Sequence, residues 1–156
     1  MSAASAPFPR AKRAPGQTFD GTRSQGVEEV GRQSLPYKKL AVWQRAMELA
    51  PLIYRLSERF PRSEMFGLTS QIQRASVSIA ANIAEGQARN SSGAFAFHLN
   101  IALGSLAEVD TLLDLAIRLG YLERRELGPT VGCMAEVRRL LNGLVRRLRN
   151  EGAASR

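Results

Sequence analysis

One segment of the chain, residues 68–83, constrains the fold more than any other. Its apolar residues recur at steps of four, three, four and four, the spacing of one face of an α-helix: Leu68, Ile72, Ala75, Ile79 and Ile83. A lane of polar residues runs beside this stripe: Gln71, Arg74, Ser78, Asn82, Glu85 and Arg89. Because the stripe is narrow and its neighbours are small or polar, it predicts a helix that lies close to another helix.

A first helix is predicted from about Tyr37 to Arg59, ending at Phe60-Pro61 because proline cannot continue a helix. Its apolar residues form two stripes: Trp43, Met47, Ala50 and Tyr54, then Val42, Leu49, Leu52, Leu56 and Phe60. Pro51 lies inside it and predicts a kink, since an interior proline costs about 3 kcal/mol. The second helix, which contains the 68–83 stripe, should begin after Ser63 as N-cap and end between Gly86 and Arg89.

A third helix should follow the turn at residues 90–93, with Ser91 or Ser92 as N-cap and Gly120 as the C-terminal cap. Its predicted core stripe is Phe95, Leu99, Ala102, Leu106, Val109, Leu113 and Ala116. The fourth helix should begin between Glu123 and Thr130. Its predicted core positions are Val131, Met134, Val137, Leu141, Leu144 and Leu148.

Four amphipathic helices joined by short loops predict an all-α fold, an antiparallel up-down-up-down four-helix bundle over residues 35–150. The two ends lack this periodicity. Residues 1–34 are rich in Ala, Ser, Pro and Gly and predict a disordered basic tail, and residues 151–156 predict a short disordered tail.

The third helix carries a further apolar row, away from its core stripe, that an isolated bundle does not need: Phe97, Ile101, Leu112, Leu115 and Leu119. Large exposed apolar patches are unusual on monomers, so this row predicts an interface in a homo-oligomer. A wide core in a tightly wound monomer is the alternative interpretation.

The composition narrows the classes of function. The chain of 156 residues has a formal charge of +8, and 19 of its 22 basic residues are arginine. This balance favours a polyanionic partner, although an ordinary basic surface is the alternative. A single cysteine excludes an internal disulfide and fits the reducing cytoplasm, and no apolar run reaches the ~20 residues that span a bilayer.

The predicted fourth helix offers the best binding surface. Arg139, Arg146 and Arg149 share one outward face with Arg138 at its edge, and Lys38 and Lys39 add charge at the start of the first helix. Guanidinium groups in such a cluster can donate paired hydrogen bonds to phosphates. A solvated arginine face without a ligand is the alternative. The sequence shows no catalytic set, metal site or cofactor motif. Asn82 suits a bond across helices or to a neighbouring subunit, Glu85 suits a surface ion pair with Arg89 four residues on, and His98 suits a partly buried structural position.

The motifs of the chain resemble those of the four helix bundle protein family, encoded in intervening sequences of bacterial large-subunit ribosomal RNA genes. The matching strings include Ser70-Gln71-Ile72, Asn82-Ile83-Ala84-Glu85-Gly86, Gly104-Ser105-Leu106 and Leu119-Gly120-Tyr121. The resemblance covers about residues 37–148. It extends to accessory proteins of diversity-generating retroelements, which implies a pentamer with a basic surface working beside a reverse transcriptase and RNA.

Together these observations predict a non-enzymatic, oligomeric protein that binds nucleic acid, RNA first, through its arginine surface. The alternative is a protein-interaction module that docks an acidic partner, such as a reverse transcriptase, without touching nucleic acid.

Overall fold

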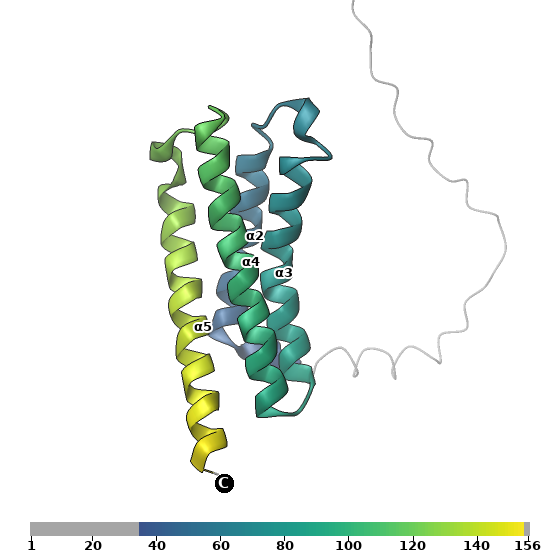
Figure 1. Ribbon diagram of the computed structural model, residues 1–156, viewed down its shortest axis with the longest axis vertical. Helices are drawn as coiled ribbons and strands as arrows, with labels where there is room; N and C mark the ends of the chain where they lie inside the picture. Colours follow the sequence, from purple (N-terminus) through teal and green to yellow (C-terminus); the bar gives the residue numbers. More distant parts are fainter. Residues whose placement is uncertain (1–34, 155–156) are drawn as a thin grey trace, which may run out of the picture. The chain divides into compact units, whose positions relative to one another are not determined.

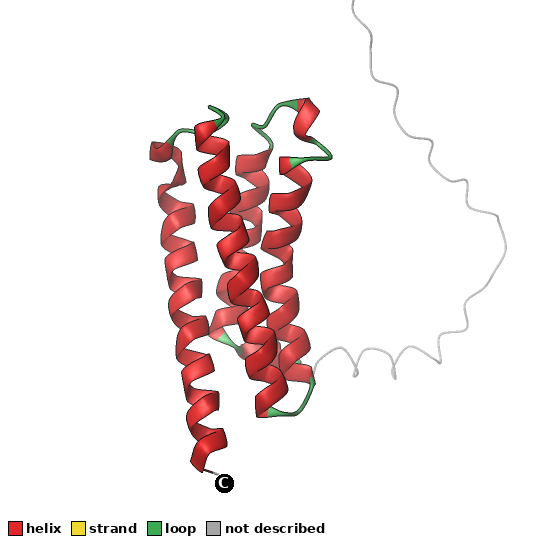
Figure 2. Ribbon diagram, in the orientation of Figure 1, coloured by secondary structure: helices red, strands yellow, loops and turns green. Residues whose placement is uncertain are grey.

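The computed structural model describes residues 35–154, which are all helix or loop with no β-strand among them (Figure 2). Four long helices make up this region: α2 (Ala41–Ser57), α3 (Leu68–Ala88), α4 (Ser92–Arg118) and α5 (Gly128–Ala154). Three short 3-10 helices accompany them: η1 (Pro36–Lys39), η2 (Arg62–Glu64) and η3 (Arg124–Leu127). The predicted all-α fold with four helices is confirmed. The tail predicted for residues 1–34 lies outside the described residues.

The four helices pack side by side around one core. α3 packs against α2 and α4, and α5 closes the arrangement by packing against the same two helices. Figure 1 shows α4 in front of α2, with α3 and α5 on either side. Largest among the fully buried side chains are leucines and isoleucines from all four helices: Leu49, Ile53, Ile72, Ile79, Ile83, Leu99, Leu106 and Leu141.

The stripe predicted for α3 is confirmed, because its five members are all buried. The N-cap prediction at Ser63 is wrong. Ser63 lies in η2, and α3 begins only at Leu68, whose backbone N–H donates to Glu64 Oε2 over 3.0 Å. A carboxylate at this end also complements the positive end of the helix dipole.

The predicted stripes of α2 are only partly correct. The helix buries Val42, Ala46, Leu49 and Ile53, whereas Met47 and Tyr54 are 47% and 43% exposed. α2 continues through Pro51, which lies on the exposed side. There the carbonyl that the proline leaves unpaired can bind water, so the helix tolerates it.

α4 begins as predicted, with Ser91 Oγ accepting from the backbone N–H of Ala94. Its core stripe from Leu99 to Ala116 is buried, and Gly120 follows the helix with a φ of +76°, a conformation that favours glycine. Leu112 does not lie on the outer row as expected, because it is 8% exposed and packs in the core.

α5 differs from its prediction at both ends. Val131, expected in the core, is 51% exposed, while Thr130 and Cys133 are buried in its place. The helix continues to Ala154, past the end expected at residue 150. The Cys133 thiol donates to the backbone carbonyl of Arg45 in α2 over 3.6 Å, so the start of α5 is tied to α2.

No helix in residues 35–154 is long and apolar enough to span a membrane.

Candidate nucleic-acid interface

The six predicted binding residues are all exposed, and four of them lie on α5. Arg138, Arg146 and Arg149 share one row with Asn142, since the steps along the helix are four, four and three residues. Arg139 lies beside this row. The other two residues, Lys38 and Lys39, belong to η1.

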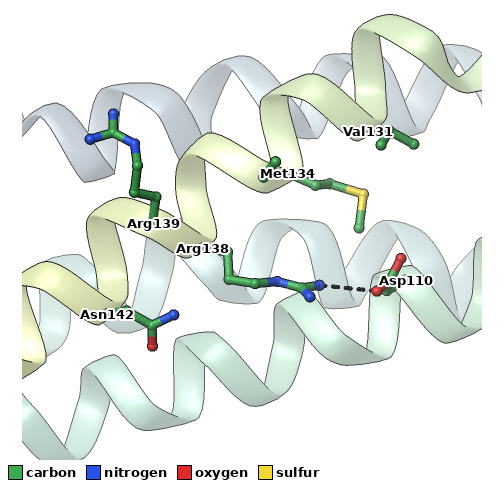
Figure 3. A pocket seen from close by; sticks show the side chains of 7 residues that line it. Asp110, Val131, Met134, Arg138, Arg139 and Asn142 are labelled. Carbon is green, nitrogen blue, oxygen red and sulfur yellow. Dashed lines mark hydrogen bonds and ion pairs between the residues drawn. The ribbon is translucent and has the colours of Figure 1, made fainter.

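The first two arginines of α5 are neutralised by acids. Arg138 pairs with Asp110 of α4, with 3.0 Å between Nη2 and Oδ2, and Figure 3 shows the guanidinium reaching across to that helix. Arg139 points away from Asp110, and its Nη2 lies 4.0 Å from Glu136 Oε1. Acids therefore lie beside the first half of this face: Asp110 of α4 pairs with Arg138, and Glu136 of α5, which also pairs with Arg45 at 2.7 Å, lies beside Arg139.

These two arginines border a shallow hollow of about 390 Å³ between α4 and α5. The hollow mixes charged, amide and apolar side chains, with Val131 and Met134 at one end and Asn142 at the other (Figure 3).

The second half of the face is different. Arg146 and Arg149 are exposed, and neither has an acidic partner in the described part of the chain. With Asn142, Val145 and Asn150 they line a hollow of about 400 Å³. Arg149 also borders a second hollow of about 580 Å³, whose other wall includes Ser92 and Gly93 at the start of α4. The unneutralised charge of α5 is therefore concentrated near its C-terminal end.

The neighbouring Arg147 does not add to this charge. Its Nε lies 2.8 Å from Glu151 Oε1, and this hydrogen bond raises the pKa of Arg147. Glu151 thereby neutralises an arginine that, like Arg139, borders the hollow between α5 and the start of α2.

Lys38 and Lys39 lie at the same end of the molecule. The residues that follow them, from Leu40 to Val42, line a hollow of about 320 Å³ together with Leu140, Leu144 and Arg147 of α5. Gln44 holds η1 in place, because its Nε2 donates to the Lys38 carbonyl over 2.9 Å. The two lysines can extend the basic surface of α5 around this end.

A separate polar network joins α3 to α4, and it contains the most recognisable string of the sequence. Asn82 donates to Ser78, and its Oδ1 lies 3.3 Å from His98 Nδ1 on α4. Ser78 and Ser105 are hydrogen-bonded at 2.9 Å. The prediction that Asn82 bonds across helices is confirmed. The cross-helix bond between the serines was not predicted, since nothing in their spacing indicates which helices are neighbours.

Glu85 and Arg89 form the predicted ion pair at 2.6 Å. The bond from Arg89, and then the proximity of His98, lower the pKa of Glu85. The His98 side chain is 12% exposed, as expected for a partly buried structural histidine. In residues 35–154, no three His, Cys, Asp or Glu side chains gather in a way that could hold a metal ion. Asp110 and Asp114 each face an arginine instead.

These features define a class: a small all-α protein in which four helices leave an arginine-rich face on the last helix. The chain belongs to the 23S rRNA-intervening sequence protein family, whose model matches residues 38–143. The family resemblance carried by the sequence motifs is thereby confirmed.

A solved structure from Bacteroides thetaiotaomicron VPI-5482 is similar to this chain. It is a protein of unknown function from the S23 ribosomal protein family, with 30% sequence identity and a TM-score of 0.61. The alignment covers 67% of this chain and 95% of that one. No curated protein matches the sequence.

Proposed function

We propose that the protein is a non-enzymatic homo-oligomer of antiparallel up-down-up-down bundles that binds nucleic acid as an accessory protein. RNA is the nucleic acid to test first, because the family is described by its link to 23S rRNA intervening sequences. From the resemblance to retroelement accessory proteins, we further propose that the oligomer is a pentamer and that its protein partner is a reverse transcriptase.

One observation carries the proposal: Arg146 and Arg149 lie one helical turn apart on α5, and no acid in residues 35–154 neutralises them. Two guanidinium groups one helical turn apart repel each other, and a phosphate backbone would relieve that repulsion. Asn142 and Asn150 line the same hollow and can add hydrogen bonds to phosphate or ribose oxygens.

The same face predicts weak sequence selectivity. α5 contains no aromatic residue, so it offers no platform on which bases could stack. Contacts from arginine to phosphate fix the position of the nucleic acid but do not read its sequence.

The test compares two double variants with the same change in charge. Arg146→Gln/Arg149→Gln removes the unpaired arginines, and Arg124→Gln/Arg125→Gln removes two that face acids elsewhere on the molecule. Each lowers the formal charge from +8 by two. Binding to a fluorescent, unstructured RNA would be followed by anisotropy at several salt concentrations.

We expect the first variant to bind roughly tenfold or more weakly at low salt, because each charge-assisted hydrogen bond contributes about 1.5–3 kcal/mol. Its slope of log affinity against log salt should become shallower by about 1.4–1.8 per subunit, the effect of losing two phosphate contacts. The matched variant should retain most of the affinity. Equal losses in both would mean that net charge alone drives binding, and unchanged binding in both would place the site elsewhere.

The absence of enzymatic activity is tested separately. Labelled RNA and DNA incubated with the protein and Mg²⁺ or Mn²⁺ should stay intact. A nuclease activity that copurifies with the protein, and that a variant of the protein lacks, would overturn this part of the proposal.

A second candidate function is docking of an acidic protein, and the hollow of Figure 3 favours it. There Val131 is 51% exposed beside Arg138 and Arg139, a mixture of apolar and basic groups suited to a protein side chain. If the unmodified protein binds no RNA or DNA at low salt, and Val131→Glu abolishes binding to a purified reverse transcriptase, docking replaces nucleic-acid binding.

A further inference from the structure

The connection between α2 and α3 holds an aromatic side chain almost completely in solvent. Phe66 is 92% exposed, and Met65 before it is 53% exposed. Within residues 35–154, the Phe66 ring packs on no other aromatic ring and takes no part in the core. Burial of a phenylalanine ring is favourable, so such a ring is expected to turn inward unless its backbone prevents it.

Hydrogen bonds on both sides of Phe66 hold its backbone. The Met65 N–H donates to the Arg62 carbonyl over 3.2 Å, and the Gly67 N–H donates to the Glu64 carbonyl over 3.0 Å. Gly67 also permits a close approach, because a Cβ there would lie 2.7 Å from Glu64 Oε2. The turn therefore fixes the ring outside the core, where a ligand can meet it without reorganising the backbone.

The acid of this turn faces inward, and the base faces outward. Besides capping α3, Glu64 accepts through Oε1 from the Tyr121 hydroxyl over 3.2 Å, and the Phe60 and Tyr121 rings pack with 5.8 Å between their centroids. The connections after α2 and after α4 thus meet at one end of the molecule (Figure 1). Arg62 is exposed and has no acidic partner in the described region.

The same end has an excess of unpaired positive charge. Three exposed arginines lack an acidic partner in residues 35–154: Arg62, Arg55 in the last turn of α2 and Arg118 in the last turn of α4. Glu58, at the end of α2, is likewise exposed and unpaired within that range. Three positive groups against one negative group favour an anionic ligand.

The size of the exposed feature separates two classes of partner. A stable protein interface covers about 800 Å² on each side and has a broad apolar centre. Here two apolar side chains follow the exposed polar residues Arg62 and Ser63 on one turn. An unpaired base needs only one aromatic face, and its phosphate needs one cation nearby. Phe66 and Arg62 supply both.

We infer that Phe66 stacks on an unpaired base of a nucleic acid, with Arg62 contacting a neighbouring phosphate. The inference rests on the proposed function and adds the class of ligand: a single strand, because the bases of a duplex are already stacked on one another. The contact is separate from that of α5. Arg149 lies beside the start of α4 and the Phe66 turn beside its end, and a helix of 27 residues is about 40 Å long.

The test uses three variants of the full chain at position 66. Phe66→Ala removes the ring, Phe66→Leu keeps an apolar side chain without a ring, and Phe66→Trp enlarges the ring. Since the side chain is 92% exposed, all three should keep their helicity, which circular dichroism checks. Anisotropy then measures binding to a long unstructured RNA and to the same RNA annealed to its complement.

The alanine and leucine variants should bind the single strand roughly five- to tenfold more weakly, with binding to the duplex unchanged. The tryptophan variant should bind at least as tightly as the natural chain. Its added fluorescence, measured against the natural chain with Trp43 alone, should fall when the single strand binds.

The phosphate contact is tested by Arg62→Gln. This variant should make the slope of log affinity against log salt shallower by about 0.7, the value for one phosphate contact on a single strand. Arg125→Gln is the matched control, because Arg125 Nε already lies 2.8 Å from Glu123 Oε2, and it should leave the slope nearly unchanged.

Each contrary result identifies a different error. If leucine binds as well as phenylalanine, or if the losses are equal on single strand and duplex, the ring does not stack on a base. If RNA binding is the same in all Phe66 variants, the inference is wrong and the proposed function stands. If light scattering gives a smaller mass for Phe66→Ala, the ring belongs to a contact between copies, which also overturns the inference. If the natural chain binds neither RNA, the proposed function fails and the inference fails with it.

Discussion

The contact between α3 and α4 and the outer face of α5 use polar residues in opposite ways. Between α3 and α4, polar side chains are paired across the contact, as in the hydrogen bonds between Asn82 and His98 and between Ser78 and Ser105. Gly86 is buried there, and an added Cβ would lie 2.6 Å from the His98 Cβ. On α5, Arg146 and Arg149 have no acidic partner in the described region, and the space around them is open.

Contacts within the fold account for the polar residues between α3 and α4, but they do not account for Arg146 and Arg149 on α5. Asn82, Glu85 and Gly86 form the most recognisable string of the sequence. Contacts with α4 account for Asn82 and Gly86, and the ion pair with Arg89 accounts for Glu85. Arg146 and Arg149 make no such contacts in the described region, so packing does not account for them. Substitutions between α3 and α4 should therefore change stability, and for Gly86 and Asn82 a matched position on α5 serves as the control.

The largest effect is expected for Gly86→Ala. The new methyl group would meet the His98 Cβ at 2.6 Å and the Phe95 ring at 3.0 Å, and neither helix can move without disturbing the core. In urea denaturation, the free energy of unfolding should fall by an amount near the upper end of the roughly 1–3 kcal/mol that overpacking costs. Gly143→Ala on α5 is the control: nothing lies within 4 Å of its added Cβ, so it should gain about 0.5–1 kcal/mol.

A smaller loss is expected for Asn82→Ala. The substitution leaves the ring nitrogen of His98 and the hydroxyl of Ser78 without their amide partner in a partly buried place. Chemical denaturation should show a cost of about 1–2 kcal/mol. Asn142→Ala, at an exposed position of α5, should stay within about 0.5 kcal/mol. Equal effects at the two sites would remove the distinction between the regions.

The smallest effect concerns pH. Because Arg89 and His98 lower the pKa of Glu85 in the folded protein, its carboxylate stabilises the fold above its ordinary value of 4.5. That stability is lost as the pH falls through the lowered value. The difference in melting temperature between the natural chain and Glu85→Gln should therefore be largest near neutral pH and shrink below about 4.5. Arg89→Gln should reduce this difference near neutral pH, where the Glu85 carboxylate is charged. A difference independent of pH would show that the ion pair does not contribute.

The periodicity of the sequence predicted the four helices and the buried stripe of α3, because every fourth or third residue there is apolar and its neighbours are polar. It failed where both sides of a helix are apolar. On α2 it assigned Met47 to a stripe, whereas the buried residue is Ala46. On α4 it assigned Leu112 to the outer row, whereas that side chain belongs to the core. Periodicity gives the angle between residues on one helix and says little about the position of the neighbouring helix.

The sequence predicted which arginines form the candidate interface, but not which of them are neutralised by acids. Spacing along α5 correctly placed four arginines on its surface. The acid beside Arg139 could have been found from spacing, because Glu136 lies three residues earlier on the same helix. The acid that pairs with Arg138 could not, because Asp110 comes from α4 and its pairing depends on how the helices are aligned.

The burial of Cys133 has a practical consequence for studying these surfaces. It is the single cysteine of the chain, it is 3% exposed, and burial raises the pKa of its thiol. Because the reactive species is the thiolate, this residue should be nearly inert toward maleimides at neutral pH. A cysteine placed at Asn142 or Gly104 would then be the one reactive thiol of the molecule. A dye or spin label attached there could report on the outer face of α5 or of α4, with Cys133 left unchanged.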